Sequence, residues 1–191
     1  MMGERIRRWG ILALLALVPV GLACGPGGSG GPAGAAAPGK GPPSWEVYFS
    51  PRGGCTEAVV AELGKAKSWV QVQAYSFTSA PIAKALVDAK GRGVKVEVLL
   101  DKSQRTEKYS SADFVAHAGI PTSIDARHAI AHNKVMVIDG EVVLTGSFNF
   151  TKAAEENNAE NLLVLRDSAL AATYSENWKA HSGHSEAYEG R

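Results

Sequence analysis

The sequence predicts an α/β protein, an α/β/α sandwich built on a mixed, mainly parallel sheet. Runs rich in β-branched residues alternate with stretches of helical periodicity, as in domains whose helices cover both faces of a sheet. A Gly- and Pro-rich leader is followed by about 145 residues, enough for one core but not for a second domain. Asp-Gly-Glu at 139–141 separates two short apolar runs, which predicts a hairpin and makes the sheet mixed.

The elements are expected in the following order along the chain. Periodicity predicts helices at 56–65, 79–90, 112–118 and 168–180, and strands at 45–49, 69–74, 94–100, 135–138, 142–145 and 161–165. Ser79 at the N-cap and Pro81 in the first turn are typical of a helix start. Gly119 follows the third helix and is expected to stop it. Most strands are separated by a helix, which favours parallel pairing.

Residues 1–24 have the organisation of a secretory signal peptide. Three arginines precede an apolar run at 11–18, which is shorter than the roughly 20 residues that span a bilayer. Residues 21–24 resemble the lipobox of bacterial lipoproteins, with Gly21 and Leu22 in transposed positions. Lipidation of Cys24 and ordinary cleavage nearby therefore both stay open. We expect an exported protein that is periplasmic, lipid-anchored to the cell envelope, or secreted.

Residues 25–43 are almost wholly Gly, Pro, Ala and Ser, so they are predicted to be a disordered linker. Such a segment suits a membrane tether or a low-complexity secretion spacer. The folded domain is expected at 44–184, with a C-terminal tail at 185–191. Cys55 is the only other cysteine, and we expect a buried small side chain there, with intermolecular pairing as the alternative.

The strongest functional pattern lies between residues 130 and 151. His132, Lys134 and Asp139 form an H-x-K-x4-D array, which is followed by Gly-Ser-x-Asn-x-Thr at 146–151. Because side chains alternate along a strand, His132 and Lys134 are expected to point the same way, with α-carbons about 7 Å apart. The same alternation places Ser147 and Asn149 together, away from two phenylalanines. A nucleophile, a cation and an amide on one patch predict phosphodiester chemistry.

On these residues the chain resembles the phospholipase D superfamily, and within it the single-motif branch of a small plasmid-borne bacterial endonuclease and mitochondrial phospholipase D-like proteins. Most members carry two motifs, whereas this chain has one motif and no internal repeat. The resemblance implies a phospholipase D-like catalytic domain over 44–184, with an α/β/α sandwich, and a homodimer that completes the site. Further matching residues are 48–51, Cys55, 74–79, 92–94 and 100–101.

The resemblance also implies residue roles. His132 would form a phosphohistidine, and His132 of a second subunit would protonate the leaving group. Lys134 and Asn149 would hold phosphate oxygens, and Ser147 would add a hydrogen bond. Glu160 would orient the histidine. Asp139 completes the signature, but alternation puts it on the face opposite His132, so we expect a structural role at the turn.

The remaining polar residues are weaker candidates. His117, His128, His181 and His184 show no ligand-like spacing, so surface roles are expected, with His128 lining the cleft. Lys102 and Arg105 follow a strand and are candidates for contacts to a nucleic-acid backbone, with a solvated loop as the alternative. No metal and no cofactor are expected.

Composition leaves the substrate open. The formal charge of the whole chain is +1, and the first 24 residues hold three arginines and one glutamate, so the remainder carries −1. That balance gives no global attraction to nucleic acid. The resemblance favours a metal-independent endonuclease acting on DNA, and possible substrates extend to RNA. Phospholipid hydrolysis is the first alternative, and a noncatalytic dimeric nucleic-acid-binding protein is the second.

Overall fold

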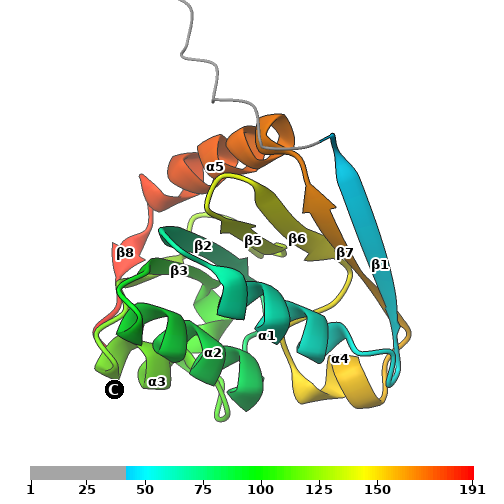
Figure 1. Ribbon diagram of the computed structural model, residues 1–191. Helices are drawn as coiled ribbons and strands as arrows, with labels where there is room; N and C mark the ends of the chain where they lie inside the picture. Colours follow the sequence, from blue (N-terminus) through cyan, green and yellow to red (C-terminus); the bar gives the residue numbers. More distant parts are fainter. Residues whose placement is uncertain (1–41) are drawn as a thin grey trace, which may run out of the picture. The chain divides into compact units, whose positions relative to one another are not determined.

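The computed structural model describes residues 42–191, which build an eight-stranded sheet with helices on both faces (Figure 1). The predicted signal peptide, Cys24 and residues 25–41 of the predicted linker lie outside the described residues. The strands are β1 Ser44–Ser50, β2 Trp69–Ala74, β3 Lys95–Asp101, β4 Thr122–Asp125, β5 Lys134–Ile138, β6 Val142–Gly146, β7 Glu160–Arg166 and β8 Glu186–Ala187. The helices are α1 Cys55–Lys65, α2 Ala80–Gly91, the 3-10 turn η1 Lys102–Arg105, α3 Ala112–His117, α4 Lys152–Glu156 and α5 Ser168–Ser182.

The sheet separates two cores, as the predicted sandwich requires. Helices α1, α2 and α3 lie on one face and α5 lies on the other (Figure 1). Met136 of β5 belongs to the larger cluster, whereas Val135 and Val137 join Ala171 of α5 in the smaller one. Successive side chains of a strand point to opposite faces, so one short strand contributes to both cores. The α/β class and the mixed sheet are confirmed.

The expectation of a mainly parallel sheet was wrong in its proportions. The strand order is β1-β7-β6-β5-β2-β3-β4-β8, and only the β2–β3 and β3–β4 pairings are parallel. The other five pairings are antiparallel. Parallel neighbours need a crossover connection, which the chain supplies through α2 and again between β3 and β4. Strands β5 and β6 are instead joined by a tight turn, β6 and β7 by a longer segment that contains α4, and β7 also pairs with β1.

The C-terminal residues belong to the folded domain and do not form a separate tail. Strand β8 pairs with β4, and the side chain of Tyr188 is buried. Its hydroxyl donates a hydrogen bond to Asp113 Oδ1 at 2.5 Å, and Arg191 forms an ion pair with the same carboxylate. Strands β4 and β8 and helix α4 were missed because segments of two to five residues show no readable periodicity.

No helix within residues 42–191 combines the length and the apolarity needed to cross a membrane.

Asp139 ties the β5–β6 turn to the start of β2. Asp139 and Gly140 both have positive φ, at 55° and 69°, as the tight turns of β-hairpins require. The Asp139 carboxylate accepts hydrogen bonds from the backbone N–H groups of Lys67, Ser68 and Trp69 at 2.9, 2.8 and 2.9 Å. One side chain therefore satisfies three donors and fixes two sheet segments relative to each other.

Replacing Asp139 with Ala should lower the free energy of unfolding by about 2–4 kcal/mol, because three backbone donors lose a charged acceptor and alanine must adopt a left-handed conformation. Urea denaturation followed by circular dichroism measures the change. The control is Glu141→Ala, because the exposed side chain of Glu141 makes no such bonds. Equal midpoints for the two variants would contradict this role for Asp139.

Candidate active site

Four strand ends meet at one edge of the sheet. Ala74, the last residue of β2, pairs with Lys134, the first residue of β5. Thr145 pairs with Val135, so the end of β6 lies beside the start of β5. Gly146 pairs with Leu162, which brings the beginning of β7 to the same edge. The two halves of the sequence pattern therefore converge, although no single strand contains both.

Tyr75 lies against both His132 and Lys134. The rings of Tyr75 and His132 have centroids 4.5 Å apart, and Lys134 Nζ lies 5.1 Å from the centroid of the Tyr75 ring. Lys134 Nζ also donates a hydrogen bond to the carbonyl oxygen of His132 at 2.9 Å. His132 is exposed in the segment before β5, whereas only 7% of Lys134 is exposed. An accessible imidazole thus stands beside a buried ammonium group.

No role was predicted for Tyr75 from the sequence, although residues 74–79 are part of the matching pattern. Its position follows from the β2–β5 pairing, and its backbone N–H donates to the carbonyl oxygen of Asn133 at 2.8 Å. Sixty residues separate the two strands along the chain, so no local spacing reveals the contact. If β2 is assumed to pair antiparallel with β5, Tyr75 is expected beside His132.

Burial lowers the pKa of Lys134 below the ordinary value for lysine, and the negative charge of Glu160 acts in the opposite direction. A desolvated ammonium group is costly unless it is compensated. The face of the Tyr75 ring and the His132 carbonyl supply part of that compensation. The part of the Lys134 charge that stays uncompensated favours binding of an anion, such as a phosphate group, at this edge of the sheet.

The segment after β6 presents a hydroxyl and an amide. Gly146 has φ 144°, and a Cβ there would lie 2.3 Å from the carbonyl oxygen of Asn161, so only glycine fits. Ser147 Oγ accepts a hydrogen bond from Asn161 N at 3.1 Å, which leaves its own proton free to donate. Asn149 Oδ1 is buried without a hydrogen-bond partner within residues 42–191. Phe148 and Phe150 are fully buried, as alternation predicted.

Glu160 lies at the same edge without contacting the histidine directly. Its backbone N–H donates to Ser50 Oγ at 3.2 Å, and its Oε1 accepts from Asn158 Nδ2 at 3.1 Å. No hydrogen bond joins Glu160 to His132 in the part of the chain that the structure describes. The Glu160 carboxylate acts on Lys134 through its charge. The side chain that packs against His132 is that of Tyr75.

Asp139 is separated from this edge by the full length of β5. Five residues of strand place it about 17 Å from Lys134 at the usual rise. The signature therefore includes a residue that the structure places far from His132 and Lys134. Its contacts to Lys67, Ser68 and Trp69 agree with the structural role expected from alternation.

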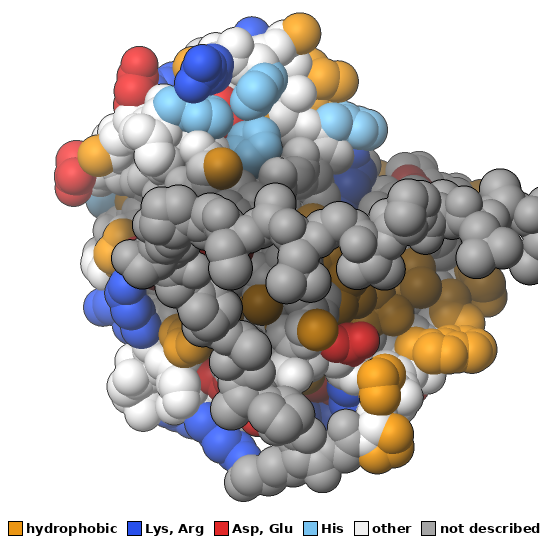
Figure 2. Space-filling view, turned by 90° about the horizontal axis from the view of Figure 1, so that it is seen from above, with side chains coloured by type: hydrophobic (Ala, Val, Ile, Leu, Met, Phe, Trp, Pro, Cys, Tyr) orange, Lys and Arg blue, Asp and Glu red, His pale blue; other side chains and the backbone are white. Residues whose placement is uncertain are grey.

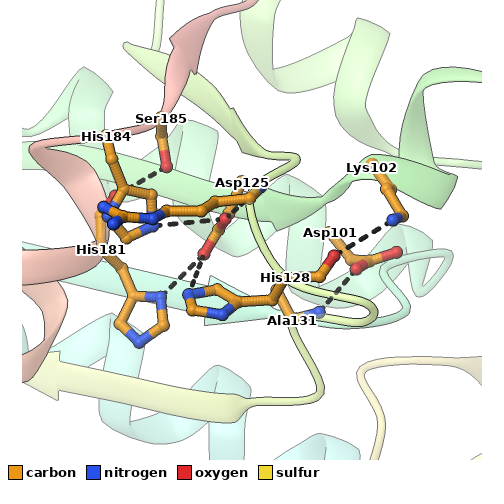
Figure 3. Close-up of polar contacts among 9 residues, drawn as sticks. Asp101, Lys102, Asp125, His128, Ala131, His181, His184 and Ser185 are labelled. Atoms are coloured by element: carbon orange, nitrogen blue, oxygen red, sulfur yellow. Dashed lines mark hydrogen bonds and ion pairs between the residues drawn. The ribbon is translucent and has the colours of Figure 1, made fainter.

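The loop that leads into His132 is held by the end of β3. Asp101 is buried, and its Oδ2 accepts a hydrogen bond from Ala131 N at 2.7 Å. Lys102 Nζ donates to the carbonyl oxygen of His128 at 3.0 Å (Figure 3). Arg105 pairs with Glu186 at 2.5 Å. Both side chains thus have partners within the domain. Contacts of Lys102 and Arg105 with nucleic acid stay predictions.

Three histidines expected on the surface instead surround a buried carboxylate. His128, His181 and His184 direct ring nitrogens toward Asp125, which is fully buried (Figure 3). His128 is exposed, as expected, and so is His117 at the end of α3, but His181 and His184 are partly buried, and the gathering of three rings on one carboxylate was not predicted. More than fifty residues separate His128 from His181 and His184, so sequence spacing could not reveal the cluster.

The structure defines an α/β sandwich that presents an exposed histidine beside a buried lysine where its central strands end. Residues 59–181 match the family model described as cardiolipin synthase, PLD-like domain. The match covers more than half of the chain, which therefore belongs to the phospholipase D superfamily. The chain also matches a phospholipase D of Rickettsia conorii, with 45% identity over 130 residues, or 68% of this chain and 65% of the relative. It thus spans less than two thirds of that relative's length.

Further similarities support the same family and fold. A mitochondrial cardiolipin hydrolase of Chlamydomonas reinhardtii is 33% identical over 112 residues, covering 59% of this chain and 50% of the relative. The structure of Nuc from Salmonella typhimurium, a phospholipase D family member, aligns with a TM-score of 0.75 and 39% identity, covering 78% of this chain and 100% of Nuc. NucT from Helicobacter pylori, at 23% identity and a TM-score of 0.71, shares the fold and covers 77% of this chain and 100% of NucT.

Replacing Glu160 with Gln should lower the pKa of Lys134 further, because the only opposing charge effect on that group is removed. Any reaction that needs the protonated amine of Lys134 would then decline at a lower pH than in the wild type as the pH is raised. NMR titration of the Lys134 side chain measures the change. The control is Glu156→Gln, because Glu156 pairs with Lys152 and does not shift Lys134. A Lys134 titration curve unchanged by Glu160→Gln would contradict the coupling.

Proposed function

We propose that this protein is a metal-independent phosphodiesterase, and that its substrate is DNA, with RNA as a further substrate. The observation that carries the proposal is the exposed imidazole of His132 beside the buried ammonium group of Lys134. The first provides a nucleophile, and the second provides a positive charge that has few compensating partners. Phosphodiester cleavage needs both groups at one phosphate.

The proposed reaction has two steps. An imidazole nitrogen of His132 attacks phosphorus, and the bond between phosphorus and the leaving oxygen breaks while a second histidine donates a proton to that oxygen. Water then attacks phosphorus and gives a proton to the second histidine, while the bond between phosphorus and the His132 nitrogen breaks and its electron pair returns to the imidazole. This step releases a phosphomonoester and restores both side chains. Lys134, Ser147 and Asn149 are proposed to bind the nonbridging oxygens, where negative charge develops.

We propose that the second histidine is His132 of another copy of this chain, in a two-fold dimer. Each chain has one motif, and within residues 42–191 the ring packed on His132 is that of Tyr75 rather than another histidine. A shared site on the two-fold axis places the same residue in both roles, because an isologous interface repeats every group.

The nucleic-acid substrate is supported by the resemblance to the single-motif endonuclease branch and by the alignment over the whole of Nuc. Phospholipid is the second candidate, favoured by the printed names of the phospholipase D and cardiolipin hydrolase relatives. Trp45, Val47 and Phe49 add a physical argument for lipid. They share one face of β1 and are 69%, 38% and 63% exposed, and β1 ends at Ser50 beside Glu160.

The location is also a proposal. The basic and apolar leader supports export to the periplasm or outside the cell, and the residues around Cys24 support lipid attachment to the envelope. A lipid-attached enzyme would meet phospholipid at the bilayer, whereas a released enzyme would meet extracellular nucleic acid.

The purified protein should cleave plasmid DNA in EDTA, because the proposed attack and charge stabilisation use protein side chains. Parallel incubations contain RNA, phosphatidylcholine vesicles or cardiolipin vesicles. His132→Ala should lower the rate by about four orders of magnitude or more, since both attack and protonation need an imidazole. The matched control is His117→Ala, an exposed histidine outside the site. Lipid turnover without DNA cleavage would make phospholipid the substrate, and a His132→Ala variant of normal activity would refute the mechanism.

Mixing subunits should reveal whether two copies share one site. When wild type is equilibrated with an equal amount of His132→Ala, random pairing leaves about one quarter of the dimers with two histidines. Activity should then fall to about one quarter of that of an undiluted wild-type preparation at the same total protein, whereas independent sites would retain about one half.

Mixing with His117→Ala, which keeps both site histidines, should leave activity unchanged. Sedimentation run alongside a dilution series provides the second measurement. Constant specific activity at concentrations where the protein sediments as a monomer would rule out the shared site.

A further inference from the structure

We propose that Asp125, His128, His181 and His184 form a binding site for a divalent transition metal ion, with Zn²⁺ as the best-fitting ion. The cluster is distinct from the proposed phosphodiester chemistry. Figure 2 shows histidine side chains gathered on one part of the molecular surface, and Figure 3 shows how three rings point at one carboxylate.

The geometry is close to that of a first coordination shell. His181 Nδ1 lies 2.7 Å from Asp125 Oδ2, His184 Nε2 lies 3.3 Å from Asp125 Oδ1, and His128 Nε2 lies 3.7 Å from Asp125 Oδ2. One ligand atom from each of the four residues lies within 4.8 Å of all the others. Tetrahedral zinc with bonds of about 2.0–2.1 Å places its ligand atoms about 3.4 Å apart. Small side-chain adjustments therefore bring four ligands to one ion.

The local hydrogen bonding is incomplete without a cation. Asp125 is fully buried, and His184 Nε2 is buried with no hydrogen-bond partner within residues 42–191, although it faces the Asp125 carboxylate at 3.3 Å. A buried polar atom without a partner is costly. The Asp125 carboxylate already accepts a hydrogen bond from Arg127 N and contacts His181 Nδ1, so an ion would chiefly give His184 Nε2 the partner that it lacks.

The chemistry of the four ligands selects the class of metal. Three imidazole nitrogens and one carboxylate oxygen suit zinc and other late first-row divalent ions, whereas Mg²⁺ and Ca²⁺ favour shells of oxygen ligands. Four protein ligands also fill a tetrahedral shell, which is typical of a structural zinc site rather than a catalytic one. The phosphodiester mechanism therefore gains no metal-bound water from this ion.

The position of the cluster defines what the ion would do. Asp125 ends β4, His128 lies in the loop that leads to His132, and His181 lies near the C-terminal end of α5, with His184 just beyond it. An ion bound to all four residues would clamp the loop to α5. Asp101 holds the same loop from the other side through Ala131 N. The ion would thus add to the fixation of residues 125–128, whereas the hydrogen bond from Ala131 N to Asp101 holds the residue next to His132 without it.

The test measures metal binding directly. Full-length protein without a polyhistidine tag is stripped with a strong chelator, dialysed, and titrated with Zn²⁺ by calorimetry. Co²⁺ is titrated separately and followed by its visible absorption, which is intense in tetrahedral sites. We expect one ion per chain and a rise in Tm when Zn²⁺ is added, because binding to the folded state stabilises it. Mg²⁺ is titrated in the same way as a comparison and should show no comparable binding.

Replacing His184 with Ala should weaken Zn²⁺ affinity at least about 100-fold, since even the loss of an outer-shell partner costs 10–100-fold. His128→Ala, at a more exposed position, provides a second ligand variant in case His184→Ala fails to fold. The matched control is His117→Ala, which should bind Zn²⁺ as wild type does.

Failure of wild type to bind a stoichiometric ion, or equal affinity in wild type and both ligand variants, would overturn the proposal and leave a histidine–carboxylate hydrogen-bond network. Cleavage assays on the stripped protein separate this result from the proposed phosphodiesterase mechanism, because that mechanism does not use the ion.

Discussion

The burial of Lys134 is the constraint on which the site depends. Lys134 is only 7% exposed as a residue, so its ammonium group needs compensation, and the β2–β5 register provides it by placing Tyr75 against Lys134 and against His132. Glu160 contributes charge from the start of β7. Each partner comes from a different strand, so the whole edge of the sheet must form before the lysine can be buried.

This arrangement prepares the edge for an anion. Lys134 is buried, so its ammonium group is poorly solvated in the folded protein, and this desolvation lowers the pKa of Lys134. A phosphate group would restore the lost interactions, and the unpartnered amide oxygen of Asn149 marks a second unsatisfied group in the same motif. Rotation of the carboxamide presents either a donor or an acceptor to a ligand. The exposed His132 therefore lies next to the buried, positively charged Lys134.

The residues of the signature serve two separate ends of β5. His132 and Lys134 lie at the start, where the strand ends converge, and Asp139 lies at the turn, where it binds three backbone amides of residues 67–69. The antiparallel pairing of β2 with β5 links these two ends. Asp139 binds the backbone just before β2, and Tyr75 follows the last residue of β2, beside Lys134. A structural residue at one end thereby helps to align the chemical groups at the other.

The sequence alone determined the α/β class, most of the elements and the candidate nucleophile, because strand alternation and the spacing of His132, Lys134 and Asn149 are local properties. It also placed Asp139 in a structural role. The antiparallel excess, the contact of Tyr75 with His132 and the cluster around Asp125 were decided only by the tertiary structure. Each depends on strand register or on the docking of α5, which brings His181 and His184 to a loop more than fifty residues away. Spacing along a chain predicts which residues share a face, but only packing determines which faces meet.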